Sequence, residues 1–268
     1  MPDFLRIADI ATTKTLFFDP DFEERCFAFC KQRDIEFLPS LENPSEIYVR
    51  DDSAKSFRVE KIDQQQKIVG YQNAFQPKVL DLFRKNHLLF VYSEDELYGV
   101  VHFSDFNKSV VSAYLFEVFF RYERTLRILL QECDLGNSDI AKHFEHKAAT
   151  CKRETSRSFY QKKLDSYHRN RDKIETLPPF QSFYLDDLIG FANAQGNSFS
   201  EDVIELRNMV MHAHELVNKQ DWNADNFIFD FASFERFFRR SLTLHGDFRK
   251  VENKTAFLQG LDGSISYE

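Results

Sequence analysis

A helical stripe of apolar residues between positions 111 and 130 constrains the fold more than any other feature of the sequence. The stripe comprises Val111, Leu115, Val118, Phe119, Tyr122, Leu126, Leu129 and Leu130. Residues at these intervals share one face of an α-helix, and that face must be buried against other elements. The pattern therefore predicts one long helix in a helical core formed by the second half of the chain.

Further helices are expected after this stripe. In chain order they are a polar, basic segment from about Asp139 to Glu175, a shorter helix from Phe183 to Asn193, a helix started by the capping-box sequence Ser198-Phe199-Ser200-Glu201, and a last helix marked by Phe227, Phe231, Phe234, Phe238 and Leu242 that ends near Gly246. Pro178-Pro179 breaks the first of these patterns. The third helix is expected to contain both Arg207 and His212, with Val203, Leu206, Val210, Ala213 and Val217 on its core face. These segments predict an all-α bundle over residues 109–246, followed by a tail over residues 247–268.

The first half of the chain has a different pattern, in which a helix, a strand, a turn and a strand occur twice. The expected elements are helices at 21–30 and 77–85, and strands at 35–41, 46–50, 88–92 and 97–103. Residues 1–108 are thus predicted to form a mixed α/β domain. The whole chain is an α+β protein in this interpretation.

Composition restricts the function classes. The formal charge of −8 argues against a protein that binds nucleic acid over its whole surface, but residues 142–173 hold ten Lys and Arg against four acids. That segment is either a solvated charged helix or an RNA-guiding surface. No apolar run approaches a membrane span, and the four cysteines lack metal-site or secretory spacing. We therefore expect a cytoplasmic protein without a metal or membrane association.

The sequence Arg207-Asn208-Met209-Val210-Met211-His212 combines a permanent cation, an amide and an imidazole. A guanidinium can grip a phosphate, and an imidazole can transfer a proton near neutral pH. On a regular helix Arg207 and His212 would lie roughly 140° apart, so they would not converge within one helix. Asn208 and His212 share a face, and a second copy of the helix in a two-fold dimer could complete a site. The alternative is that these are ordinary surface groups.

Arg-Asn-x-x-x-His on a late helix of a bundle resembles the signature of the HEPN superfamily. The resemblance implies a metal-independent endoribonuclease with a composite site in a homodimer, RNA as substrate, a role as a toxin or in antiviral defence, and a neutralising partner protein. Arg207 and His212 would be catalytic, with Asn208 orienting the imidazole or a phosphate oxygen. Glu123, in the first long helix, matches the acidic residue that often pairs with the motif arginine; otherwise it is an exposed helix glutamate.

The repeated unit of the first half resembles a degenerate pair of CBS motifs, most clearly at Gly99-Val100-Val101-His102-Phe103-Ser104-Asp105-Phe106. The resemblance implies a regulatory or dimerisation domain. In nucleotide-binding members an aspartate at the place of Asp105 holds a ribose, which makes an adenine nucleotide a candidate regulator. Here His102 stands where those members usually carry a hydroxyl residue. An N-cap for the helix that follows is the alternative role of Asp105.

Two other interpretations concern the histidines and the function class. His212 and His214 would point about 160° apart on a helix, and His143 and His146 lack a surrounding ligand cluster, so both pairs are interpreted as surface histidines and not as metal ligands. The rival function is a non-enzymatic nucleotide-sensing or assembly module with an inactive HEPN-like dimer. An accessory subunit of a nucleotidyltransferase is a third interpretation, based on superfamily association alone.

Overall fold

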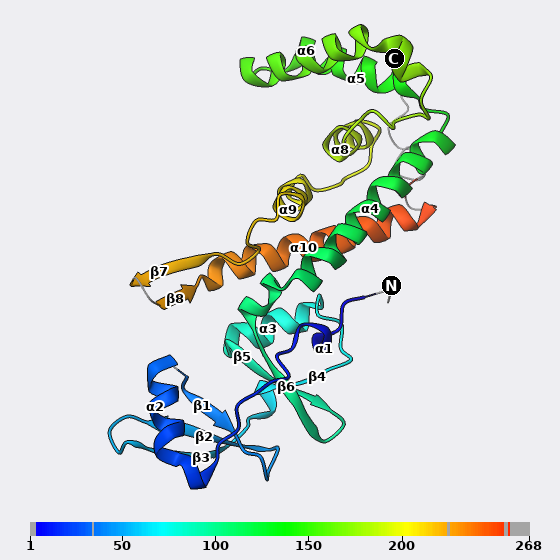
Figure 1. Cartoon of the computed structure of the whole chain (residues 1–268). Helices are drawn as coiled ribbons and strands as arrows, with labels where there is room; N and C mark the ends of the chain where they lie inside the picture. The colour runs from blue at the N-terminus through cyan, green and yellow to red at the C-terminus, as the bar shows by residue number, and fades with distance from the viewer. Residues whose placement is uncertain (1–3, 34, 224–225, 255–256, 258–268) are drawn as a thin grey trace. The chain divides into compact units, whose positions relative to one another are not determined.

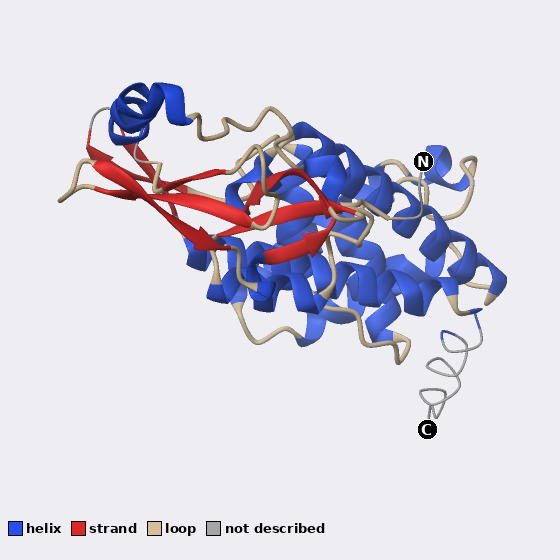
Figure 2. Cartoon of the chain, turned by 90° about the horizontal axis from the view of Figure 1, so that it is seen from below, coloured by secondary structure: helices blue, strands red, loops and turns tan. Residues whose placement is uncertain are grey.

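The computed structural model describes residues 4–33, 35–223, 226–254 and 257 (Figure 1). The chain divides into two compact units, each discontinuous in sequence: unit 1 comprises residues 1–114 and 215–238, and unit 2 comprises residues 115–214 and 239–268. The protein is mixed α+β (Figure 2). The strands described all belong to unit 1. None of the helices in the described part of the chain has the length and apolar character needed to span a bilayer.

Unit 1 is built on short strands with a few helices. Its helices are α1 (Ile7–Ile10), α2 (Glu23–Arg33) and α3 (Pro77–Lys85), with 3₁₀ turns η1 (Pro20–Phe22), η2 (Gln64–Gln66) and η3 (Phe103–Asn107). Its strands are β1 (Phe37–Pro39), β2 (Glu46–Asp51), β3 (Ser56–Lys61), β4 (Lys67–Val69), β5 (Leu88–Ser93), β6 (Glu96–His102), β7 (Lys219–Asn223) and β8 (Asn226–Phe229).

These strands form three sheets. The order β1-β2-β3 is antiparallel throughout, whereas β4 runs parallel to β5 and β5 antiparallel to β6. Helix α3 connects the two parallel strands, and Pro77 opens it at a position where its missing N–H is not needed. The predicted helix–strand–turn–strand order occurs twice, as α2-β1-β2 and α3-β5-β6. The third strand of each sheet was not expected, and it makes the two repeats topologically different.

Aromatic side chains form much of the core of unit 1. Phe83 and Phe106 are fully buried, and both pack against Phe234 of the returning segment at ring-centroid distances of 5.3 Å. Each buried ring of this size removes a large apolar area from water, so the abundance of phenylalanine is explained in this unit by packing.

Unit 2 is helical in its described residues. It contains α5 (Asn137–Thr150), α6 (Glu154–Arg169), α7 (Arg171–Glu175), α8 (Leu185–Ala194) and α9 (Asp202–Met211), and it shares with unit 1 the two longest helices, α4 (Ser109–Glu132) and α10 (Phe231–Glu252). All eight residues of the predicted stripe on α4 are buried. That prediction is confirmed, because the stripe is long enough to specify both the helix and its inward face.

Several expected helix boundaries are wrong. The basic segment is divided into α5, α6 and α7, because Cys151 is extended at φ −61° and ψ 126° and Asn170 leaves helical geometry. The last helix begins at Phe231, since Phe227 lies in the β7–β8 hairpin, and it continues past Gly246 to Glu252. Helix α9 ends at Met211, which places His212 at its C-cap.

Candidate functional site

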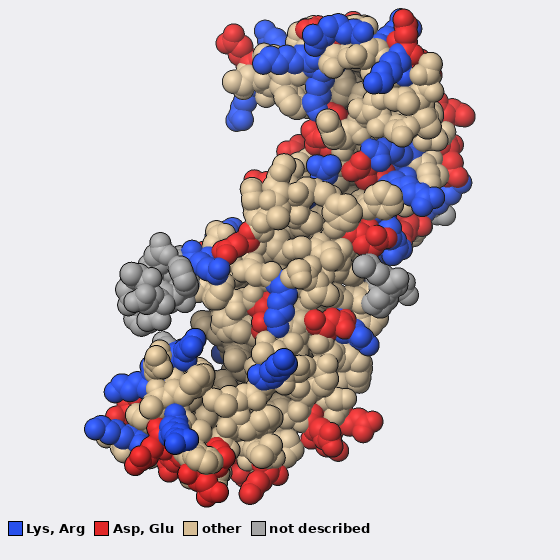
Figure 3. Space-filling model, viewed as in Figure 1, with Lys and Arg blue, Asp and Glu red and all other residues tan. Residues whose placement is uncertain are grey.

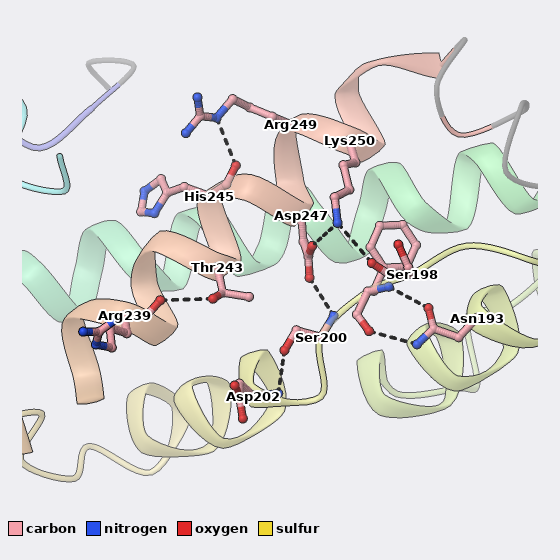
Figure 4. Close-up of polar contacts among 11 residues, drawn as sticks. Asn193, Ser198, Ser200, Asp202, Arg239, Thr243, His245, Asp247, Arg249 and Lys250 are labelled. Carbon is pink, nitrogen blue, oxygen red and sulfur yellow. Dashed lines mark hydrogen bonds and ion pairs between the residues drawn. The ribbon is translucent and has the colours of Figure 1, made fainter. Parts of the chain in front are cut away.

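The loop before α9 is fixed by side chains of unit 2, and this sets the entry of the helix that carries Arg207 (Figure 4). Asn193 accepts from the backbone N–H of Phe199 at 2.7 Å and donates to its carbonyl at 2.9 Å. Asp247 of α10 accepts from the backbone N–H of Ser200 at 2.9 Å, and Lys250 donates to the carbonyl of Ser198 at 3.0 Å. Helix α9 therefore begins from an anchored loop.

The capping box predicted at Ser198–Glu201 is wrong. The N-cap is Glu201, and the hydroxyl of Ser200 accepts from the backbone N–H of Asp202 at 3.2 Å. Because Asp247 and Lys250 already bind the backbone of this loop, the helix starts one turn later than the local sequence indicates.

Arg207 lies beside α4 of the same unit. Its Nη2 is 3.9 Å from Oε2 of Glu123, which is a long ion pair, and its buried Nε has no hydrogen-bond partner among the described residues. Glu123 binds Arg127 more closely, through Oε1. Arg127 is held in turn by the carbonyls of Phe180 and Phe183, at 3.1 and 3.0 Å. The expected partnership of Glu123 with Arg207 is thus present, but Arg127 is the nearer cation.

These side chains line an open pocket of about 580 Å³ in unit 2. Three arginines face one carboxylate there, so the pocket carries positive formal charge. Phe116 and Phe120 add aromatic surface and are 50% and 56% exposed, so they are not part of the core. The lining residues are Phe116, Phe120, Glu123, Arg124, Arg127, Ile128, Gln131, Pro178, Pro179, Gln181, Arg207 and Met211. A cationic pocket with aromatic walls suits an anionic ligand that has a flat ring.

The sequence alone indicates no distinct role for Arg124 or Arg127. Both follow Glu123 on α4, and Arg127 is one helical turn beyond it, so the spacing was the available signal. Arg124 is exposed, and its side chain has no hydrogen bond or ion pair within the described residues. It is therefore a cation available to a ligand.

His212 is not among the residues that line this pocket. Arg207 and Met211 lie on the pocket face of α9, whereas Asn208 and His212, also one turn apart, lie on the adjacent face and are exposed. Within one copy of the chain Arg207 and His212 are thus on different faces, as the helix geometry predicted.

The end of α9 has the hydrogen bonds of a Schellman motif. His214 N–H donates to the carbonyl of Met209 at 2.9 Å, and Ala213 N–H donates to that of Val210 at 3.3 Å. Ala213 is exposed and left-handed at φ 51°, so its predicted place on the core face is wrong. Because the helix has ended, the rings of His212 and His214 lie 5.9 Å apart and do not diverge as a continuous helix would require.

Replacing Ala213 with glycine should increase the free energy of unfolding by about 0.5–1 kcal/mol, because glycine adopts positive φ without a Cβ clash. Urea denaturation measures this change. The matched control is Ala149→Gly in an exposed position of α5, which should lower stability by up to about 1 kcal/mol. Equal destabilisation by both substitutions would contradict the left-handed geometry at Ala213.

Lys and Arg side chains gather over α5 and α6 (Figure 3). Of the ten basic residues between positions 142 and 173, eight are exposed. Lys142 pairs with Asp139 at 2.9 Å, and Arg157 donates to the carbonyl of Cys151 at 3.1 Å. The exposed cations form a surface that can attract a polyanion.

Asp105 is bound by neighbouring groups of unit 1. Its Oδ2 accepts from the backbone N–H of His102 at 2.8 Å, and its Oδ1 is 3.0 Å from Nζ of Lys108 and 3.4 Å from the hydroxyl of Thr12. Asp105 is the third residue of η3, whose N-cap is His102, so it completes a capping box and is not itself an N-cap. This geometry gives the carboxylate a structural role.

A second pocket, of about 600 Å³, lies in unit 1 and includes Glu36, Lys85, His87 and His102. Burial lowers the pKa of His102 to about 4, although Asp105 opposes the shift. Its Nδ1 is occupied by the hydroxyl of Ser104 at 2.7 Å. The imidazole is therefore neutral at physiological pH.

Among the described residues, no three His, Cys, Asp or Glu side chains gather in a way that could hold a metal ion. Comparison of the chain with protein-family models, with curated proteins and with solved structures gives no match.

Proposed function

We propose that this chain is a metal-independent endoribonuclease whose site forms from two copies of α9. The observation that carries the proposal is the arginine pocket. Arg207 lines it beside Arg124 and Arg127, and the buried Nε of Arg207 has no partner among the described residues. His212 is exposed at the end of the same helix, on the next face. The helical character of unit 2 and the late position of α9 also support a HEPN-like bundle. The parallel β4–α3–β5 unit followed by β6 supports a CBS-like first half.

In this proposal His212 acts on the RNA 2′-hydroxyl as a general base, or on the leaving 5′-oxygen as a general acid. Two-fold pairing supplies two histidines, one for each proton transfer. Arg207 stabilises the charge that develops on the phosphorane-like transition state, and Asn208 orients the imidazole or a phosphate oxygen. The products are a 2′,3′-cyclic phosphate and a 5′-hydroxyl. DNA is not a substrate, because it lacks the attacking hydroxyl.

The remaining parts of the proposal follow from this reaction. The exposed cations of α5 and α6 guide RNA in the cytoplasm toward the dimer site, and no metal or cofactor takes part. A role as a toxin or in antiviral defence would require a neutralising partner. The pocket of unit 1 is the candidate site for an adenine nucleotide that regulates cleavage. If no cleavage occurs, the same pocket favours a nucleotide-sensing or assembly module.

The proposal is tested by incubating the protein in excess EDTA with an RNA oligonucleotide and with its 2′-O-methyl counterpart. We expect cleavage of the RNA alone, with 2′,3′-cyclic phosphate ends detected by mass spectrometry. Cleavage of the 2′-O-methyl strand would overturn the mechanism, as would cleavage that stops in EDTA and returns with a divalent cation.

Replacing Glu123 with glutamine should reduce RNA cleavage about tenfold and lower the free energy of unfolding by about 1 kcal/mol, since a partly buried charge that holds two arginines is lost. Single-turnover kinetics and urea denaturation measure the two effects. The matched control on the same helix is Glu132→Gln, because Glu132 pairs with Lys254 at the surface. If both variants behave like wild type, Glu123 has no positioning role.

A further inference from the structure

A smaller cavity of unit 2 lies apart from the arginine pocket and has a different chemistry. It has a volume of about 200 Å³. Residues of α5, α6, α8 and the start of α9 line it: His143, Phe144, Phe159, Tyr160, Lys163, Asp186, Asp187, Ile189, Gly190, Glu201 and Ile204. The sequence interpretation of His143 as a surface histidine is wrong, because its ring is packed inside unit 2, whereas His146 is exposed as expected.

His143 is a buried polar group on the wall of this cavity. His143 is 8% exposed, and neither of its ring nitrogens forms a hydrogen bond within the described residues. Its neighbours are the rings of Tyr160 and Phe191, at centroid distances of 6.3 and 5.8 Å. Burial lowers the pKa of His143 to about 4, so the ring is neutral near pH 7 and one nitrogen is an acceptor. The ring nitrogens are not among the buried side-chain atoms that lack a partner, so the acceptor is open to water or to a ligand in the cavity.

The charged groups of the cavity are unbalanced. Lys163 forms ion pairs with Asp187 and, at 3.1 Å, with Asp186. Glu201 supplies a third carboxylate that has no ion pair or side-chain hydrogen bond in the described part of the chain. Three carboxylates thus face one ammonium, and an anionic ligand would be repelled.

The walls between these groups are aromatic. The rings of Phe159 and Tyr160 meet edge to face at 5.4 Å, and Nζ of Lys163 already lies 4.5 Å from the centroid of Phe159. The cavity therefore stabilises a cation by two means, carboxylate charge and ring faces. Its unused polar atoms, on Glu201 and His143, are acceptors, so the ligand must bring hydrogen-bond donors.

We propose that this cavity binds a small organic cation with a primary ammonium group, such as a short aliphatic diamine. The ammonium would donate to Glu201 and to the free ring nitrogen of His143, while the methylene chain lies against Phe159 and Tyr160. A ligand of this size fits the cavity volume, and its dissociation constant should be on the order of 1 mM. The proposal does not depend on RNA cleavage, since its site and its readout are separate from Arg207 and His212.

The test is isothermal titration of the full chain with 1,4-diaminobutane at constant ionic strength, with sodium chloride and magnesium chloride as comparison titrants. We expect saturable binding of the diamine, and at least about tenfold weaker binding by Glu201→Gln, which loses a charged acceptor. Glu145→Gln removes an exposed carboxylate of α5 outside the cavity and should bind like wild type. His143→Phe, if folded, should also weaken binding.

The proposal would be overturned if the diamine heats did not saturate, or if sodium chloride gave the same heats. Equal affinity of wild type and Glu201→Gln for the diamine would also overturn it. Tighter binding of magnesium than of the diamine would likewise show that the cavity does not select an organic cation. Because Glu201 is exposed, its glutamine variant is expected to fold and keeps the test decisive.

Discussion

Replacing Arg207 with alanine should reduce RNA cleavage about 100-fold or more. In the proposed mechanism the guanidinium stabilises charge that appears only in the transition state, and the loss of one such donor typically has an effect of this size. Arg207→Lys keeps the charge but loses the planar fork, so it should recover only part of the activity. Single-turnover cleavage of an RNA oligonucleotide in EDTA measures both variants.

The other arginines provide the comparison for this prediction. Arg124 lines the same pocket and is exposed, so Arg124→Ala should weaken RNA binding more than it slows the cleavage step. Arg25 is an exposed cation of α2 that lies outside both the pocket and the basic segment, and Arg25→Ala should leave the cleavage step unchanged. An Arg207→Ala variant that cleaves as fast as Arg25→Ala would contradict the catalytic role.

Acid should destabilise the protein through two histidines, buried His143 in unit 2 and partly buried His102 in unit 1. Burial lowers the pKa of His102 and of His143 to about 4 in the folded protein, whereas an exposed imidazole titrates near 6.5. The unfolded chain therefore binds protons first as pH falls. The stability contributed by each neutral histidine is complete above about pH 6.5 and is lost progressively toward pH 4, with a cost on the order of 2 kcal/mol per histidine at about pH 4.5.

Urea denaturation of wild type and His143→Gln near neutral pH and at about pH 4.5 measures this effect. Glutamine cannot titrate, so the variant should lose less stability on acidification than wild type. His146→Gln is the control, because His146 is exposed on the same helix. If His143→Gln and wild type lose the same free energy between the two conditions, His143 is not a buried neutral imidazole.

Strong local patterns predicted several elements of the fold. Helix α3 begins and ends where Pro77 and the apolar face placed it, and the α4 stripe is buried at every predicted position. By contrast, β3 and β4 were missed. Strand β4 is only three residues long and gains its place by pairing with β5, a contact that no local pattern specifies.

Part of the local geometry around Arg207 could be predicted from the sequence. The face separation of Arg207 and His212 follows from helix spacing alone, and Glu123 lies near Arg207 as expected. The end of α9 could not be predicted, because Ala213 adopts a left-handed conformation that the sequence normally marks with glycine. Arg127 was overlooked because its importance comes from carbonyls more than 50 positions away in the chain.

The most direct measurement of the central claim is to incubate wild-type and His212→Ala protein with total RNA in excess EDTA and to analyse the fragment ends. We expect wild type to produce fragments with 2′,3′-cyclic phosphate ends and the His212→Ala protein to produce none. Equal cleavage by both proteins, or no cleavage by either in the presence of added nucleotides, would contradict a ribonuclease that uses His212.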